Sequence, residues 1–116
     1  MKTLIHPHAD DISLHGVLYA LGDPIRLQIV RCLAQTDTAC CGSLTNNLPK
    51  STLTRHFRVL RENGVIAQEV RGRQLVNTLR RDVLESRFPG LLQAVLDADK
   101  TTKKSVAKKT GKKKKV

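Results

Sequence analysis

A proline stands directly before an amphipathic basic stretch, and this arrangement constrains the fold more than any other feature of the sequence. Pro49 lacks a backbone N–H and disfavours helix at Leu48, so one helix ends here and another begins at Ser51. The outer face of the helix over 51–63 carries short hydroxyls and then arginines, which suits DNA, although an ordinary solvated face has the same pattern. His56 flanks the inner face and is expected to be a half-buried structural histidine. The apolar stripe of that inner face consists of Leu53, Phe57 and Leu60.

The start of the chain is typical of an arm followed by a short helix. Residues 1–9 are expected to form an extended N-terminal arm, because Pro7 disfavours helical backbone at the residue before it. Apolar residues at helical spacing then predict a helix over 10–21, with Asp10 at its positive end and Gly22 after its last turn.

Two further helices are predicted before the proline. Asp23 offers an N-cap acceptor and Pro24 suits the first helical position, so a helix should begin here. This helix, over 24–35, is apolar around most of its circumference, which indicates a central and buried position. A short helix over 40–48 follows, and together with 51–63 it forms a helix-turn-helix pattern.

Two β-prone runs follow the basic helix and predict a hairpin. Gly64 ends the helix, and the runs 65–70 and 75–79 enclose a tip that contains Gly72. The arginines at the outermost point of this tip are Arg71 and Arg73.

A last helical segment and a polybasic tail complete the chain. Asp82 and Glu85 have the spacing of an acidic capping box, and the helix that they start should break at Phe88 and restart at Pro89. Residues 100–116 hold nine lysines and no acidic residue, so they carry +9 of the net charge of +11. Such a composition buries too little apolar surface to fold alone, so we expect a disordered tail.

The predicted fold is mainly α with one β-hairpin. It is a winged helix-turn-helix with the element order α-α-α-α-β-β-α and a disordered, lysine-rich C-terminal tail. Residues 10–99 should form the DNA-binding and dimerisation domain, between the arm at 1–9 and the tail at 100–116. A length of 116 residues fits one such domain.

Composition and motifs narrow the class of partner. A net charge of +11 favours an anionic partner, and double-stranded DNA is the leading candidate. An aromatic content of 3% without tryptophan argues against proteins that stack single-stranded bases on aromatic rings. We find no nucleophile elbow, zinc-protease motif, phosphate loop or paired carboxylates, so no enzymatic activity is expected.

Cysteine usage and hydropathy predict a cytoplasmic protein. Three cysteines, two of them adjacent, do not form a disulfide framework, so reduced thiols in a reducing compartment are expected. Cys32 falls on the apolar side of its helix and is expected to be a small buried hydrophobe. Neither a signal peptide nor an apolar run of membrane-spanning length is visible, so no membrane partner is expected.

Two stretches resemble the ArsR/SmtB family of bacterial transcriptional repressors. The first is the helix start LGDPIRLQIV at 21–30, and the second is STLTRHFRVLRENGVI at 51–66. The resemblance covers roughly residues 12–97. It implies a homodimer that binds a two-fold operator, represses transcription and is released by an effector. We expect such a bacterial protein in the cytoplasm, associated with the nucleoid.

The resemblance also implies which residues meet DNA and which meet a second copy. The recognition helix over 51–63 lies in the major groove, and the wing over 70–75 meets the adjacent minor groove or its phosphates. The expected DNA contacts are Lys50, Ser51, Thr52, Thr54, Arg55, Arg58, Arg71 and Arg73. The expected dimer contacts on the first and last helices are Ile12, Leu14, Val17, Leu18, Leu91, Leu92, Val95 and Leu96.

The family's sensing sites are not matched by this sequence. Cys40 and Cys41 are adjacent where the family's thiolate motif separates its cysteines by one residue, and adjacent helical side chains diverge by about 100°. The last helix, over 82–98, has neither His nor Cys, which argues against a zinc site there. Two alternatives stay open. His6 and His8 of the arm could join these cysteines around zinc or another thiophilic metal, or the cysteines could act as a thiol switch.

Two classes of DNA-binding function fit the sequence. A sequence-specific dimeric repressor would read bases with the hydroxyls and arginines of 51–63. A histone-like architectural protein would act mainly through the lysine tail, because phosphate contacts carry no sequence preference. The hydroxyl groups at the start of the basic helix favour the first class.

Overall fold

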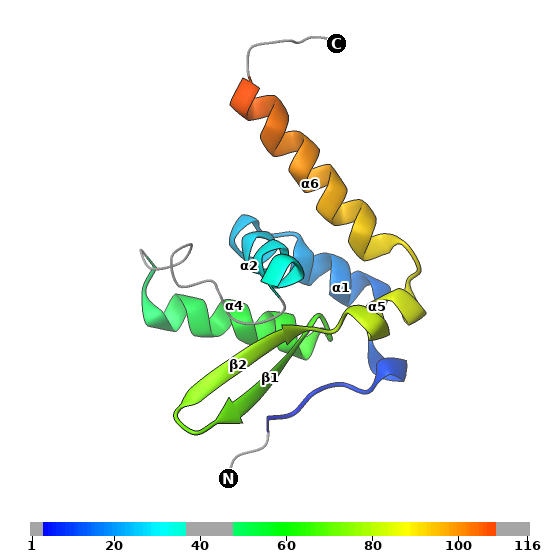
Figure 1. Ribbon diagram of the computed structural model, residues 1–116. Coiled ribbons are helices and arrows are strands. Elements are labelled where there is room, and N and C mark those ends of the chain that lie inside the picture. The colour runs from blue at the N-terminus through cyan, green and yellow to red at the C-terminus, as the bar shows by residue number, and fades with distance from the viewer. Residues whose placement is uncertain (1–3, 37–47, 109–116) are drawn as a thin grey trace.

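The computed structural model describes residues 4–36 and 48–108 of the chain. In this part, helices and one two-stranded antiparallel sheet follow in the order of a winged helix-turn-helix, which confirms the predicted fold (Figure 1). The helix predicted at 40–48 lies outside the described residues apart from Leu48. The described elements are the 3-10 helix η1 (Ala9–Asp11), α1 (Leu14–Leu21), α2 (Pro24–Thr36), α4 (Lys50–Glu62), β1 (Ile66–Arg71), β2 (Gln74–Leu79), α5 (Arg81–Arg87) and α6 (Leu91–Lys108).

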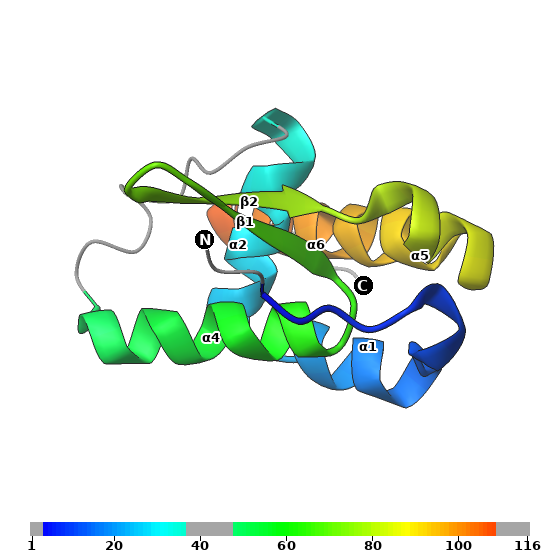
Figure 2. The ribbon, with the colours of Figure 1, turned by 90° about the horizontal axis from the view of Figure 1, so that it is seen from below.

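The helix α2 is the central element of the fold. Its residues Ile29, Val30 and Leu33 are fully buried, and the helix packs against α1, α4 and β2 (Figure 2). The Oδ2 atom of Asp23 accepts hydrogen bonds from two first-turn amides at 2.9 and 3.1 Å. Both the predicted start of this helix and its buried position are therefore confirmed.

The helix α1 begins later than its apolar spacing predicts. Asp10 belongs to η1, and α1 is capped instead by Ser13, whose hydroxyl accepts the Gly16 N–H at 3.1 Å. Ile12 lies between the two elements in extended backbone and is buried. The prediction that this helix starts at Asp10 is therefore wrong, whereas Gly22 ends α1 as predicted.

The N-terminal arm runs beside β1 (Figure 2). The Nε2 atom of His6 accepts a hydrogen bond from the backbone N–H of Gln68 at 2.9 Å. Arg80, at the end of the hairpin, donates from Nη1 to the carbonyl oxygen of Pro7 at 3.0 Å. These two contacts attach the arm to the wing.

A glycine with left-handed backbone joins the recognition helix to the wing. Leu60 is fully buried and anchors α4, which ends at Glu62. Gly64 follows two residues later with a φ of 81°. A Cβ atom at Gly64 would lie 2.4 Å from Cδ1 of Ile12, so the space admits only a glycine. The predicted helix end is thus confirmed, and the contact with Ile12 adds a second reason for it.

The hairpin has a regular antiparallel register. The strands pair from Ile66 opposite Leu79 to Arg71 opposite Gln74. The tip is therefore a two-residue turn that begins at Gly72, whose φ is 61°. The predicted hairpin is confirmed. Each strand reaches one residue further toward the tip than predicted, and β1 also begins one residue later.

The capping box predicted at Asp82 and Glu85 is wrong. Because β2 runs almost directly into α5, the N-cap is Arg80, and no side chain caps this helix. Glu85 accepts a hydrogen bond from the backbone N–H of Gly90 at 3.2 Å, beyond the end of its helix. The predicted break is present, since α5 ends at Arg87 and a new helix follows.

The last helix continues past the predicted start of the tail. Residues 100–108 are helical, whereas the sequence predicts disorder throughout 100–116. Lysine and alanine propagate a helix well once a packed segment has nucleated it, and Arg31 of α2 binds Asp99 at 2.8 Å just before this extension. Figure 1 shows α6 extending away from the hairpin. No helix in the described ranges combines the length and the apolar character needed to cross a membrane.

The carboxylate of Asp23 makes the start of α2 sensitive to pH. Partial burial acts to raise the pKa of Asp23, but the backbone N–H groups of Arg26 and Ile25 act to lower it. The nearby His56 and Arg26 side chains lower it further, so the pKa lies below the ordinary value of 3.8. A carboxyl group of this kind stabilises the fold above its unfolded pKa and loses that effect as pH falls through the folded pKa.

We expect Asp23→Ala to lower the free energy of unfolding by about 1 kcal/mol at pH 7, because two amides lose their acceptor. The difference from wild type should begin to shrink below about pH 4, where Asp23 takes up a proton in the unfolded chain, and it should be lost as pH falls through the lower pKa of the folded state. Urea unfolding at pH 7 and pH 3 measures both values. Asp23→Asn is the matched control, since its amide oxygen still accepts hydrogen bonds. A difference that stays constant with pH would contradict the assigned role.

Candidate nucleic-acid interface

The helix α4 turns a polar and basic face away from the core. Leu60 is fully buried and Phe57 is half-buried against the core, which fixes the rotation of the helix. Thr52, one of the expected DNA contacts, is half-buried. The other expected contacts on this helix are exposed: Lys50, Ser51, Thr54, Arg55 and Arg58.

The start of α4 differs from the prediction by one residue. The helix begins at Lys50, its N-cap is Pro49, and no side chain caps it. The helix start predicted at Ser51 is therefore one residue late, because Ser51 already lies inside the first turn. Its exposed hydroxyl is not used in capping, so it can face a ligand of the helix.

The wing tip carries two exposed arginines, Arg71 and Arg73. Arg71 donates from Nη2 to Oε1 of Glu69 at 2.9 Å, and both side chains are largely exposed. An exposed pair of this kind contributes less than about 1 kcal/mol, so a phosphate group can compete with Glu69 for the guanidinium. Both arginines are therefore available at the outermost point of the hairpin.

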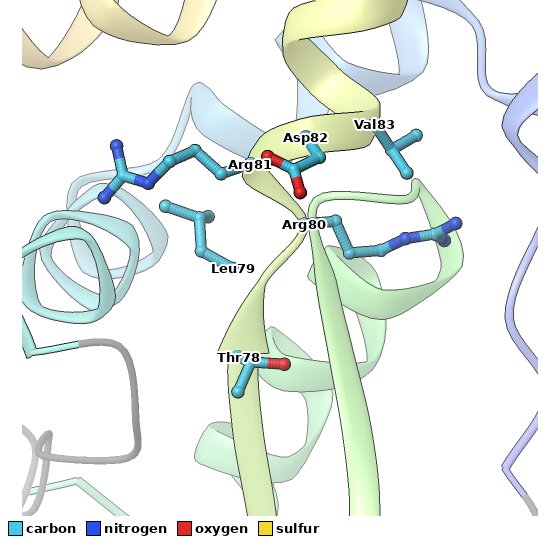
Figure 3. A pocket seen from close by; sticks show the side chains of 6 residues that line it. All are labelled: Thr78, Leu79, Arg80, Arg81, Asp82 and Val83. Atoms are coloured by element: carbon cyan, nitrogen blue, oxygen red, sulfur yellow. The ribbon is translucent and has the colours of Figure 1, made fainter.

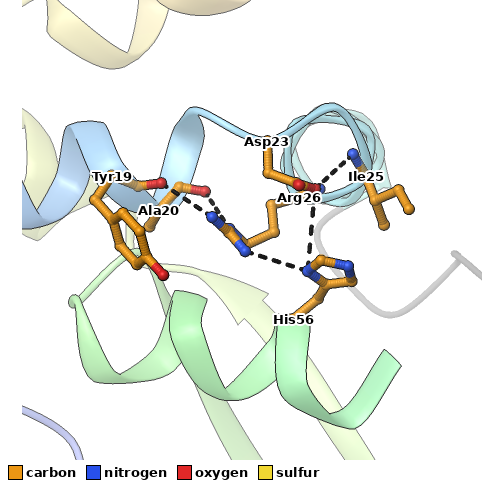
Figure 4. A network of polar contacts seen from close by, with 6 residues as sticks. All are labelled: Tyr19, Ala20, Asp23, Ile25, Arg26 and His56. Carbon is orange, nitrogen blue, oxygen red and sulfur yellow. Dashed lines mark hydrogen bonds and ion pairs between the residues drawn. The ribbon is translucent and has the colours of Figure 1, made fainter. Parts of the chain in front are cut away.

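A buried arginine behind α4 joins three elements (Figure 4). Arg26 is 8% exposed, and it donates from Nε to the carbonyl of Ala20 at 2.8 Å and from Nη2 to that of Tyr19 at 3.1 Å. These carbonyls belong to the last turn of α1, and that of Tyr19 also accepts the backbone N–H of Gly22 at 3.2 Å. The Nη1 atom lies 3.2 Å from Nδ1 of His56 on α4. One guanidinium thus connects α1, α2 and the recognition helix.

His56 on α4 is the acceptor in its contact with Arg26. A guanidinium group only donates hydrogen bonds, so Nη1 of Arg26 is the donor and Nδ1 of His56 accepts. Oδ2 of Asp23 lies 3.9 Å from the same nitrogen. His56 is half-buried, as predicted, but the partner that orients it was missed. The sequence contains one hint of this partner, since Arg26 follows Asp23 by three residues and therefore lies in the first turn of the same helix.

The structure describes two of the four residues considered for sensing. His6 uses its Nε2 lone pair to accept the Gln68 N–H, and His8 is exposed on the arm. The other two, Cys40 and Cys41, lie outside the described residues. Within residues 4–36 and 48–108, no group of three metal-ligating side chains occurs.

Cys32 on α2 is half-buried against the core and takes part in a disulfide bond. The expectation of a reduced thiol is therefore wrong for this residue. Sequence spacing alone does not reveal whether two sulfur atoms can reach the geometry that a disulfide requires. The chain has two other cysteines, Cys40 and Cys41, whose positions fall in the undescribed range.

The expected dimer residues divide into two groups. Leu14 and Leu18 are 48% and 46% exposed on α1, and the neighbouring Tyr19 is 61% exposed. Sequence spacing cannot separate apolar residues that cover their own core from those that cover a second copy. The others contribute to the core of the protomer, where Ile12, Val17, Leu92 and Leu96 are buried and Leu91 and Val95 are half-buried.

A shallow hollow at the junction of β2 and α5 is lined by residues 78–83 (Figure 3). Arg80 and Arg81 extend from it in opposite directions. Arg80 donates to the carbonyl of Pro7 at 3.0 Å, and Arg81 donates to the carbonyl of Ala34 at 2.7 Å. These arginines therefore tie the arm and the end of α2 to the base of the wing.

Known proteins similar to this chain share its helix-turn-helix. The helix-turn-helix domain family matches residues 21–69. The uncharacterized HTH-type transcriptional regulator YceK of Bacillus subtilis (strain 168) is 32% identical over 90 residues, which cover 75% of this chain and 90% of YceK.

Two solved structures share the architecture. The transcriptional repressor BigR from Xylella fastidiosa has a TM-score of 0.50 and 25% identity, covering 65% of this chain and 85% of BigR. An ArsR family transcriptional regulator has a TM-score of 0.54 at 16% identity, covering 92% of this chain and 100% of its own. At that identity the second likeness shows the fold alone.

Proposed function

Because the chain belongs to the helix-turn-helix transcriptional regulators and has the winged fold of the ArsR type, we propose that it is a homodimeric repressor. It binds a two-fold operator on double-stranded DNA through α4 and the wing over 70–75, and an effector releases it. It acts in the cytoplasm, in association with the nucleoid. Its family and fold are those of DNA-binding regulators and not of enzymes.

The exposed basic face of α4 is the observation that carries this proposal. Arg55 and Arg58 extend from a helix whose opposite side is anchored by Leu60, so their direction is fixed by the core. Arginine is the commonest reader of guanine in the major groove. The exposed hydroxyls of Ser51 and Thr54 lie on the N-terminal part of the helix, which reaches base edges in this class of protein.

The exposed face of α1 supports the dimer in this proposal. Leu14 and Leu18 present apolar surface that a second copy of α1 would remove from water. The half-buried Leu91 and Val95 on α6 extend the proposed contact. A two-fold dimer then presents two copies of α4 to successive major grooves, about 34 Å apart.

The lysines of 100–116 supply a second attraction that does not depend on sequence. The backbone of α6 leads away from the hairpin as far as Lys108, where the described part of this segment ends (Figure 1). A histone-like architectural protein, acting mainly through these lysines, is the alternative function. Gel shifts at moderate salt separate the two, because a repressor needs a large ratio of operator to scrambled-duplex affinity and an architectural protein a ratio near one.

We expect Arg55→Ala to weaken binding to the operator by about 1–3 kcal/mol, and binding to random duplex by less, because only the operator contact involves a base. The wild-type protein first selects the operator from a pool of random duplexes, and fluorescence anisotropy then measures both affinities. Arg55→Lys keeps the charge but not the bidentate geometry, so it should restore binding to random duplex alone. Equal losses on both duplexes would assign Arg55 to a phosphate. If no operator emerges, the repressor proposal is wrong.

We expect Leu18→Glu to weaken self-association at least about tenfold, because it places a charge in the proposed apolar contact. Sedimentation equilibrium measures this as a shift toward the protomer mass of 12.9 kDa. Leu75→Glu is the matched control, since Leu75 is also 46% exposed but lies on the wing. Equal effects of the two substitutions would show that α1 is not the dimer face.

We expect truncation after Asp99 to weaken binding to every duplex and to flatten the salt dependence, while operator preference stays intact. Each lost phosphate contact should reduce the slope of log K against log salt by about 0.9. Replacing the nine tail lysines by glutamine in the full-length chain is the control for shortening α6. Loss of operator preference on truncation would show that the tail contributes to specific recognition.

A further inference from the structure

A buried amide joins the wing to the recognition helix and to the arm. Gln68 on β1 is 5% exposed, and its cross-strand partner Asn77 on β2 is 6% exposed. Nε2 of Gln68 donates to Oδ1 of Asn77 at 2.8 Å. Nη1 of Arg61 on α4 donates to Oε1 of Gln68 at 2.6 Å. The backbone N–H of Gln68 donates to His6 of the arm at 2.9 Å.

The contact with His6 explains why the two amides meet. Because the N–H of Gln68 points to the outer edge of β1, it does not pair with β2. Gln68 and Asn77 therefore form a non-hydrogen-bonded pair of the antiparallel ladder. In such pairs the Cα atoms approach to about 4.5 Å and the side chains lie closer together than in the hydrogen-bonded pairs.

This network is directional, unlike apolar packing. The oxygen and the nitrogen of the Gln68 amide have different partners, so a rotated or shifted hairpin would leave buried groups without hydrogen bonds. The Nε atom of Arg61 is buried and has no hydrogen-bond partner among the described residues. Loss of Gln68 would therefore leave still more of this guanidinium unsatisfied.

We propose that Gln68 is a positioning residue that sets the angle between the wing and the recognition helix. It thereby sets the distance between the major-groove site read by α4 and the neighbouring groove met by the wing. Gln68 is buried and acts through other residues, through Arg61 on the helix and through His6 on the arm. This inference rests on the DNA-binding function proposed above.

A double-mutant cycle tests the proposal on the operator selected by the wild-type protein. Gln68→Leu and Arg61→Met remove the two sides of one contact, and each should weaken operator binding about tenfold. The double variant should bind about as weakly as either single variant, because a shared contact is lost only once. Independent roles, such as a direct phosphate contact by Arg61, would multiply to about a hundredfold loss and overturn the proposal.

Hydroxyl-radical footprinting separates positioning from stability. Gln68→Leu should lose or displace the protection under the wing while the protection under α4 remains. Thermal unfolding verifies that each variant is folded at the assay temperature. If Gln68→Leu does not fold, Arg61→Met breaks the same contact from α4 and should give the same footprint. Protection that falls equally under both elements would assign Gln68 to stability alone and overturn the proposal.

A conservative variant and a neighbouring control complete the test. Gln68→Glu keeps an acceptor for Arg61 but loses the donor to Oδ1 of Asn77. Rotation of the Asn77 amide lets its nitrogen donate to the new carboxylate instead, so this variant should bind the operator within about threefold of wild type. Glu69→Gln is the matched control, because Glu69 is the next residue on β1 but is exposed and bonded to Arg71, so wing protection should persist. Gln68→Glu binding as weakly as Gln68→Leu, or a control that loses wing protection, contradicts the proposal.

The outcomes also separate this inference from the function on which it rests. If the wild-type protein selects an operator and the cycle is additive, the positioning role is wrong and the repressor proposal stands. If the wild-type protein selects no operator, the repressor proposal fails and the positioning role fails with it.

Discussion

The placement of the recognition helix depends on the buried guanidinium of Arg26. This group belongs to a residue in the first turn of α2. It donates hydrogen bonds to two carbonyls in the last turn of α1 and to His56 on α4. A buried charge is tolerated only when its hydrogen bonds are made, so these three elements cannot shift independently. The direction in which Arg55 and Arg58 extend is therefore decided inside the protein, on the side of α4 that faces the core.

The wing depends on a second contact of the same helix. Arg26 reaches α4 near its middle through His56, and Arg61 near the end of the helix reaches β1 through Gln68. Both links are hydrogen bonds to buried or half-buried groups, so both specify an orientation in addition to holding the elements together. The recognition helix thus acts as the shared partner of the helical core and of the hairpin.

The sequence predicted correctly those helix ends that depend on residues close to them in the chain. The N-cap at Asp23 and the left-handed Gly64 depend on a few adjacent residues, and the exposed face of α4 follows from helix phase. The helix starts predicted at Asp10 and Asp82 are wrong, because several residues near a helix end can cap it and tertiary contacts choose among them. The partners of Gln68 could not be predicted from neighbouring residues either, because one of them, His6, lies 62 residues away and only the tertiary fold brings it close.

The arm has a consequence for the order in which the protein assembles. His6 pairs across 62 residues, and Pro7 and Ile12 accept hydrogen bonds from arginines 73 and 75 residues away. Loops of this length cost chain entropy before any contact forms, so the arm docks only after the hairpin and α5 exist. The residues of the arm thus find their place late, although they precede the rest of the domain in the sequence.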